Sequence, residues 1–190
     1  MINSYTSFFI AVPIPDEYIF SFAQLVNEIN NSFPEIPTVN PTTPHLTLYY
    51  LTQEAQDDLN YIKSRVEEIK NILENNTVKI GGFNCFGKEL PRVLFLNVGY
   101  PTSLNSFNQQ LATSLKKYSA EDNGLGFYPH VTVASVKDPK AQEIFQAHRS
   151  RIETLFNGIR WTFPITEIII YGANSKIQPE LQNPISKIVI

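Results

Sequence analysis

The chain has 190 residues, of which 43% are hydrophobic and 12% aromatic, a composition typical of a soluble globular protein with a sizeable core. Its formal net charge of −3 argues against binding of long nucleic acids through many phosphate contacts, because such binding needs clustered Lys and Arg. Cys85 is the only cysteine, which excludes an internal disulfide and a cysteine-based metal site, and a reducing cytoplasm fits best.

The first half of the chain alternates strands with helices. Segment 6–13 is a short apolar run of β-favouring residues, and helical spacing follows it from Asp16 to Ile29. The proline-rich stretch 32–44 precedes a strand at 45–51. Apolar residues then recur every three or four positions over 54–73, which predicts a second helix.

The second half repeats this alternation and ends in strands. Asp138 followed by Pro139 is a favourable N-cap and first-turn pair, so a helix is expected from there to about Phe156. The remaining elements are expected as strands at 77–87, 92–99 and 130–136, a helix at 102–118, a loop at 119–129, and strand-like stretches at 160–163, 165–172 and 187–190.

The order of these elements predicts an α+β fold, because it contains more strands than one parallel sheet would need. Strand, helix, strand, helix in the first half has a counterpart in the second half. We therefore expect one domain, 1–190, made of two intertwined lobes. An approximate twofold relates them, with mainly antiparallel sheets flanked by helices.

Two octets are the most similar parts of this repeat. Residues 44–51 read PHLTLYYL and residues 129–136 read PHVTVASV, so two of the three histidines share an HxT pattern. Side chains alternate across a strand, which places His45, Thr47 and Tyr49 on one face. The same rule places His130 and Thr132 together. If the polar faces oppose one another across a central cleft, it holds two imidazoles and two hydroxyls.

This set of groups suits the cleavage of a phosphodiester. A histidine pKa near 6.5 allows one imidazole to act as base while the other acts as acid at the same pH. Threonine hydroxyls can donate hydrogen bonds to the non-bridging phosphate oxygens as their charge grows. Such a site requires no metal and no cofactor. A structural repeat without chemistry is the alternative reading of the same octets.

With these motifs, the chain resembles the two-histidine (2H) phosphoesterase superfamily, which is defined by two HxT motifs. More specifically, it is similar to the bacterial RNA 2',3'-cyclic phosphodiesterases, also called 2'-5' RNA ligases. The resemblance spans most of the chain, and the two motifs are its specific part. The supporting segments are FFIAVPIP, FGKELPRVLFLNV and ITEIIIYGANS.

The resemblance implies a bilobal α+β fold and hydrolysis of a 2',3'-cyclic phosphate to a 2'-phosphate. By motif position, His45 would donate a proton to the departing 3'-oxygen and His130 would accept one from water. Thr47 and Thr132 would hold the phosphate. The residues alone do not assign acid and base, because the two motifs are so alike.

The second motif departs from the pattern of many relatives. They continue it as HxTLAR, whereas this chain has Ser135 at the arginine position. An arginine there would bind phosphate bidentately, so its loss bears on substrate affinity and identity. Lys137 is close enough to substitute, although a solvated surface role is the commoner one for lysine.

Other candidates near the motifs have structural roles as their default. Tyr49 is the best candidate for stacking on a nucleobase because it should share the face of His45, although buried aromatics usually pack in a core. We expect His148 on a helix surface, without metal-ligand spacing. Cys85 is expected as a small buried hydrophobe. The Gly81-Gly82 pair fits no nucleotide-binding fingerprint.

The expected protein is a cytoplasmic, metal-independent hydrolase acting on RNA ends or small nucleotides. No membrane partner is expected, since no apolar run approaches the roughly 18 residues of a membrane span. A monomer is the default expectation. Hydrolysis of 2'-5' linked or cyclic oligonucleotides, and non-catalytic binding of nucleotides or RNA ends, are the two alternatives.

Overall fold

The fold is taken from a computed structural model, which describes residues 5–87, 90–120, 126–174 and 181–190. The helices are α1 (Asp16–Ser32), α2 (Leu59–Ile69), α3 (Thr102–Ser114) and α4 (Pro139–Leu155), with short 3-10 helices η1 (Gln53–Asp58), η2 (Lys70–Leu73) and η3 (Lys116–Tyr118). The strands are β1 (Ser7–Pro13), β2 (His45–Leu51), β3 (Thr77–Phe86), β4 (Val93–Gly99), β5 (His130–Ser135), β6 (Arg160–Pro164), β7 (Glu167–Asn174) and β8 (Leu181–Val189).

These strands form two antiparallel sheets of four, which confirms the expected α+β class. The first sheet has the order β2-β1-β7-β8, and the second has the order β5-β4-β3-β6. In each sheet the strand that carries an HxT motif pairs only with the strand that begins the same half of the repeat. The two motif strands therefore occupy equivalent edges, as the twofold repeat predicts.

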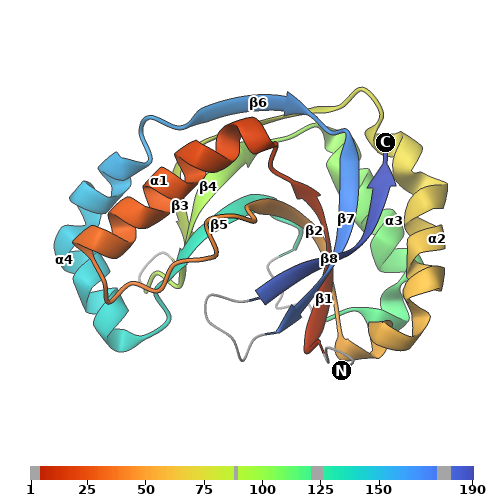
Figure 1. Ribbon diagram of the computed structural model, residues 1–190, viewed down its shortest axis with the longest axis horizontal. Coiled ribbons are helices and arrows are strands. Elements are labelled where there is room, and N and C mark those ends of the chain that lie inside the picture. The colour runs from red at the N-terminus through yellow and green to blue at the C-terminus, as the bar shows by residue number, and fades with distance from the viewer. Residues whose placement is uncertain (1–4, 88–89, 121–125, 175–180) are drawn as a thin grey trace.

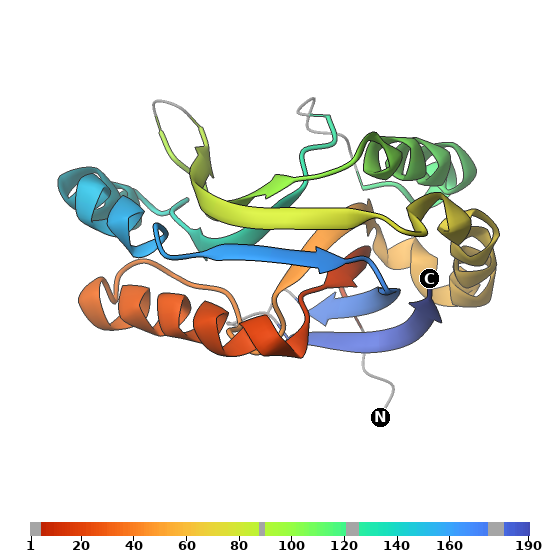
Figure 2. The same cartoon turned by 90° about the horizontal axis from the view of Figure 1, so that it is seen from above.

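The helices cross between the sheets, so the two lobes are intertwined. Helix α1 follows β1 of the first sheet but packs on the second, where its Tyr18 ring stacks on Trp161 at 5.3 Å. Helix α3 follows β4 of the second sheet but packs on the first, where Asn108 Nδ2 donates to the Leu48 carbonyl at 2.7 Å. Figures 1 and 2 show α1 beside α4 at one end of the molecule and α2 beside α3 at the other.

A segment before each motif strand closes the outer edge of the opposite motif strand. Ahead of β2, Val39 N–H donates to Val133 O at 3.1 Å, and Pro37 O accepts from the Ser135 N–H at 2.8 Å. Ahead of β5, Tyr118 O accepts from the Thr52 N–H at 2.8 Å. Backbone groups near the end of each motif strand thus form hydrogen bonds with the other half of the repeat. These bonds help to fix the position of β2 relative to β5.

Helix α4 begins where the sequence predicts it. The Asp138 carboxylate accepts from the Lys140 and Ala141 N–H groups, and Pro139 occupies the first turn. The helix is interrupted at His148, whose backbone is not helical (φ −119°, ψ 17°), and this kink was not expected from the sequence. Among the described helices, none combines the length and the apolar character that crossing a bilayer requires.

The last strand is longer than the predicted stretch 187–190. Strand β8 begins at Leu181 and includes Pro184, a residue that argues against a central strand because it lacks an N–H donor. Pro184 is tolerated because β8 lies at the edge of its sheet, and a bulge at Ile185 interrupts the pairing beside it. The expected helix at 54–73 is likewise divided into η1, α2 and η2.

Candidate active site

A cavity of about 340 Å³ lies between the two motif strands. Its lining includes His45 from β2, and His130, Thr132 and Ser135 from β5, together with Lys137 just beyond β5. The two HxT strands therefore do face a common space. Two histidines far apart in the chain thus line the same cavity.

Both imidazoles are held in the same way. Nδ1 of His45 lies 2.9 Å from the Thr43 carbonyl oxygen, and Nδ1 of His130 lies 2.8 Å from the Tyr128 carbonyl oxygen. A carbonyl can only accept, so Nδ1 carries the proton in each ring. In the neutral state Nε2 is then the basic nitrogen, and it is the atom available to a ligand.

His45 sits in an aromatic environment. Its ring stacks on Phe9 at a centroid distance of 4.7 Å and lies 5.7 Å from the ring of Tyr171. Burial lowers the pKa of His45 to about 4, although the Thr43 carbonyl opposes this shift and the nearby His130 adds to it. Burial also raises the pKa of Tyr171 to about 12, with Glu167 adding to the shift.

His130 is less enclosed, and polar groups lie close by. Its ring contacts Phe86 edge-on at 4.8 Å and Phe95 at 5.0 Å, and burial lowers its pKa while the Tyr128 carbonyl opposes that shift. Asn97 is its direct cross-strand neighbour on β4. The Asn97 side chain accepts from Asn84 Nδ2 at 3.1 Å, and its own amide donates to a backbone carbonyl.

Both motif strands contain a bulge at the same point, directly after the threonine. In β2, Thr47 pairs with Ala11 and Tyr49 with Ile10, which leaves Leu48 as the extra residue. In β5 the same break in register leaves Val133 as the extra residue. A bulge of one residue reverses which face the following side chains occupy.

The bulge makes the expected position of Tyr49 wrong. Tyr49 is 8% exposed and belongs to the hydrophobic core, whereas Tyr50 is 53% exposed and lines the cavity. Ser135 is the equivalent of Tyr50 in the second motif and lines the cavity too. The sequence contains a signal for the bulge, because the spacing of the buried aliphatic residues changes from two positions to three in both octets. These residues are Leu46, Leu48 and Leu51 in the first octet and Val131, Val133 and Val136 in the second.

The two threonines are not equivalent in their access to the cavity. Thr132 lines it, whereas Thr47 lies on the same strand face as His45, partly buried, and is not among the described residues that line it. Lys137 is exposed at the rim and forms no ion pair within the described parts of the chain.

The remaining sequence candidates lie outside this cavity. His148 is exposed on α4 with its ring 5.3 Å from Phe33, consistent with the surface role expected for it. Cys85 is partly buried in β3, and burial raises the pKa of its thiol, so the thiol stays protonated. Gly124, in the loop expected at 119–129, falls outside the described residues. Across the described ranges, no three His, Cys, Asp or Glu side chains gather closely enough to hold a metal ion.

Known structures share this fold. TT0787 of Thermus thermophilus superposes with a TM-score of 0.69 at 18% identity, over 96% of this chain and 97% of that one. Escherichia coli LigT complexed with 3'-AMP gives 0.69 at 16% identity over 98% of each chain. LigT complexed with ATP gives 0.65 at 16% identity, again over 98% of each. At these identities the likeness shows the fold.

The sequence comparisons identify the family. No curated protein sequence matches the chain. The family model of the 2'-5' RNA ligase superfamily matches residues 20–174, which is most of the chain and contains both HxT motifs. With two antiparallel sheets, two lobes and both motifs in place, the chain belongs to the 2'-5' RNA ligase superfamily of 2H phosphoesterases.

Proposed function

We propose that this chain hydrolyses 2',3'-cyclic phosphates on RNA ends or nucleotides, leaving a 2'-phosphate and a free 3'-hydroxyl. One observation carries the proposal: two imidazoles from equivalent edge strands, each with Nδ1 bonded to a carbonyl and Nε2 available, line one cavity. The complexes of Escherichia coli LigT with 3'-AMP and ATP support a nucleotide as the kind of ligand.

The reaction then needs one proton acceptor and one proton donor. Nε2 of His130 accepts a proton from water as the water oxygen forms a bond to phosphorus. The bond from phosphorus to the 3'-oxygen breaks on the opposite side, and Nε2 of His45 donates a proton to that oxygen. Thr132 donates a hydrogen bond to a non-bridging oxygen, whose charge increases in the transition state. Afterwards His130 loses a proton to solvent and His45 gains one.

This assignment follows the order of the two motifs, and it requires His45 to be protonated when the substrate is bound. A protonated His45 with a pKa of about 4 is a strong acid and gives up its proton readily. The same low pKa keeps His45 neutral near pH 7 while the cavity holds no ligand. A bound phosphodiester anion raises the pKa of both imidazoles because opposite charges attract, so the substrate itself favours the protonated donor. The bell-shaped pH profile expected for turnover therefore reports the pair.

The proposal is tested by incubating the protein with a 2',3'-cyclic mononucleotide in excess chelator and identifying the product by phosphorus NMR. A 2'-phosphate is expected, and the rate should not depend on added divalent metal. Unchanged substrate or a 3'-phosphate would contradict the proposal. The His148→Ala variant serves as the control that removes a histidine from outside the cavity.

Two alternative functions, cleavage of other phosphodiesters and binding of nucleotides without cleavage, are tested with further ligands. A panel containing 2'-5' linked dinucleotides and cyclic oligonucleotides shows whether the cavity cleaves other phosphodiesters. Ser135 in place of the arginine of many relatives motivates the third possibility, a protein that binds nucleotides without cleaving them. Calorimetry that detects binding of a 2',3'-cyclic nucleotide with no turnover would favour that possibility.

A further inference from the structure

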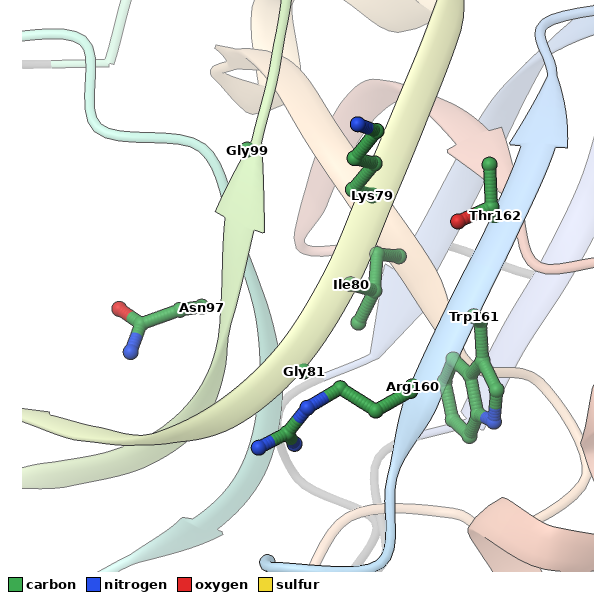
Figure 3. A pocket seen from close by; sticks show the side chains of 8 residues that line it. All are labelled: Lys79, Ile80, Gly81, Asn97, Gly99, Arg160, Trp161 and Thr162. Atoms are coloured by element: carbon green, nitrogen blue, oxygen red, sulfur yellow. The ribbon is translucent and has the colours of Figure 1, made fainter.

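A second cavity, of about 290 Å³, lies on the second sheet away from the two histidines. Strands β3, β4 and β6 form it, and its lining includes Lys79, Gly81, Asn97 and Arg160. Figure 3 shows Arg160 extending from β6 across β3 at Gly81, with Lys79 further along β3 and Asn97 on β4. The described residues that line this cavity include no Asp or Glu.

This cavity lies on the same face of the sheet as His130. Directly opposed residues of antiparallel strands share a face, and Asn97 is opposed to His130. Lys79 is opposed to Gly99, two residues along β4 from Asn97, and Arg160 is opposed to Gly81. Three interstrand steps of about 4.8 Å separate β5 from β6, so Arg160 starts about 14 Å from the strand of His130.

Both cations on this face are free to meet an anion. Lys79 and Arg160 are exposed, and neither forms an ion pair with a residue that the structure describes. Among the residues that the structure describes, the Arg160 guanidinium donates a hydrogen bond only to the carbonyl of its neighbour Ile159. A planar guanidinium and an ammonium group on one face of a sheet suit successive phosphate groups.

The glycine pair singled out in the sequence sets the position of Arg160. Gly81 and Gly82 form a bulge opposite Asn97, and Gly82 has a positive φ of 75°. A Cβ on Gly81 would lie 2.4 Å from the Ile159 carbonyl oxygen and 3.1 Å from the Arg160 side chain. Only glycine therefore allows β6 and the Arg160 side chain to lie this close over β3.

The corresponding face of the first sheet is different in character. Next to His45 it presents a small cluster of buried apolar residues, formed by Phe9, Ala11, Tyr171 and Ala173. The second sheet also places aromatic rings, Phe86 and Phe95, next to His130, but farther across this sheet its face carries amide and cationic groups. On the first sheet the lysine of this face, Lys187, forms an ion pair with Glu167, whereas the face beyond His130 presents cations without such a partner among the described residues.

We propose that the cation face, defined by Lys79, Asn97 and Arg160, binds backbone phosphates of a single-stranded RNA whose cyclic phosphate end lies between His45 and His130. This inference rests on the proposed function and names its substrate class as an oligonucleotide. A mononucleotide held at the histidines does not reach Arg160, whereas the adjoining phosphates of a strand do. The net charge of −3 is compatible with this, because only a few phosphates are bound.

The test compares two substrates with the same reactive end. We expect the double variant Lys79→Gln/Arg160→Gln to lower kcat/KM for a hexaribonucleotide with a 2',3'-cyclic phosphate about tenfold, and to leave kcat/KM for the cyclic mononucleotide unchanged. The slope of log kcat/KM against log salt for the hexamer should become shallower by about 1.4, since two phosphate contacts are lost at about 0.7 each. The matched control is Lys63→Gln/Lys116→Gln, two exposed cations on α2 and η3.

Three outcomes would overturn the inference: an unchanged rate for the hexamer, an equal loss for both substrates, or the same loss in the control variant. A second measurement tests the binding of RNA to the cation face independently of the proposed hydrolysis. Fluorescence anisotropy with a labelled hexamer ending in a 2'-phosphate measures binding without turnover. If the protein cleaves neither substrate, the proposed function fails, and the affinity ratio between wild type and the double variant decides the inference.

Discussion

The two halves of the active site share a geometry and differ in their surroundings. Both motif strands have a histidine bonded through Nδ1 to the carbonyl two residues before it, and both have a bulge directly after the threonine. Both histidines contact aromatic rings, Phe9 and Tyr171 at His45 and Phe86 and Phe95 at His130, but only His130 also has Asn97 beside it and the cation face beyond. The repeated residues set the geometry, and neighbours outside the repeat set the electrostatics.

The largest effect is expected from removing either histidine. His45→Ala and His130→Ala should each lower kcat for a 2',3'-cyclic nucleotide by roughly 10² or more, because each removes a proton-transfer partner. The double variant should be little worse than the worse single variant, since the two residues act as a unit. Steady-state kinetics with His148→Ala as control checks this. A wild-type rate in either single variant would contradict the proposal that both histidines transfer protons in the reaction.

The two threonines offer a finer comparison between the halves. Thr132 lines the cavity and Thr47 does not, so we expect Thr132→Val to lower kcat roughly thirtyfold and Thr47→Val to lower it severalfold at most. Thr132→Ser keeps the hydroxyl and should retain most of the rate. Equal losses in the two valine variants would show that both halves hold the phosphate equally.

The environment of His45 should also affect how the free energy of unfolding depends on pH. Its pKa is about 4 when folded and about 6.5 when unfolded, so the unfolded chain binds the proton first as pH falls. Its contribution to the free energy of unfolding is thus retained above pH 6.5 and lost as the pH falls toward 4, by about 2 kcal/mol between pH 7 and pH 4.5.

Urea unfolding of wild type and His45→Asn at the two pH values measures this difference. The variant should lose less stability on acidification, and His148→Ala should behave as wild type does. Identical pH dependences in wild type and His45→Asn would mean that the aromatic enclosure does not disfavour the charged imidazole.

The smallest effect concerns Ser135, the position at which many relatives carry arginine. Ser135 lines the cavity, so Ser135→Arg places a guanidinium within reach of the phosphate. We expect KM for the cyclic nucleotide to fall about tenfold, in line with a charge-assisted hydrogen bond. Ser150→Arg adds the same charge on exposed α4 as a control. An equal fall in both variants would reflect overall charge alone.

The sequence predicted the element order and the twofold repeat because both depend on local patterns. Periodicity distinguishes helix from strand, and Asp138 with Pro139 marks a helix start through local capping. The convergence of His45 and His130 followed from the repeat of their octets. These inferences need no knowledge of which strands pair.

The features that the sequence did not predict depend on contacts between strands. The position of Tyr49 was wrong because simple alternation ignores a bulge, and a bulge is defined only against the partner strand. The contacts of Phe9 and Tyr171 with the His45 ring require the order β2-β1-β7, which no local pattern gives. The Gly81-Gly82 pair permits the close approach of β6 to β3, and the sequence does not show that these two strands are neighbours.

The central claim is that the two imidazoles act from either side of one phosphorus atom. A crystal structure of the protein with a bound 2'-nucleotide tests it most directly. We expect the 2'-phosphate in the cavity between the motif strands, with Nε2 of His45 and Nε2 of His130 each within hydrogen-bonding distance of a phosphate oxygen. A phosphate bound through one imidazole alone, or held only at Lys79 and Arg160, would contradict the claim.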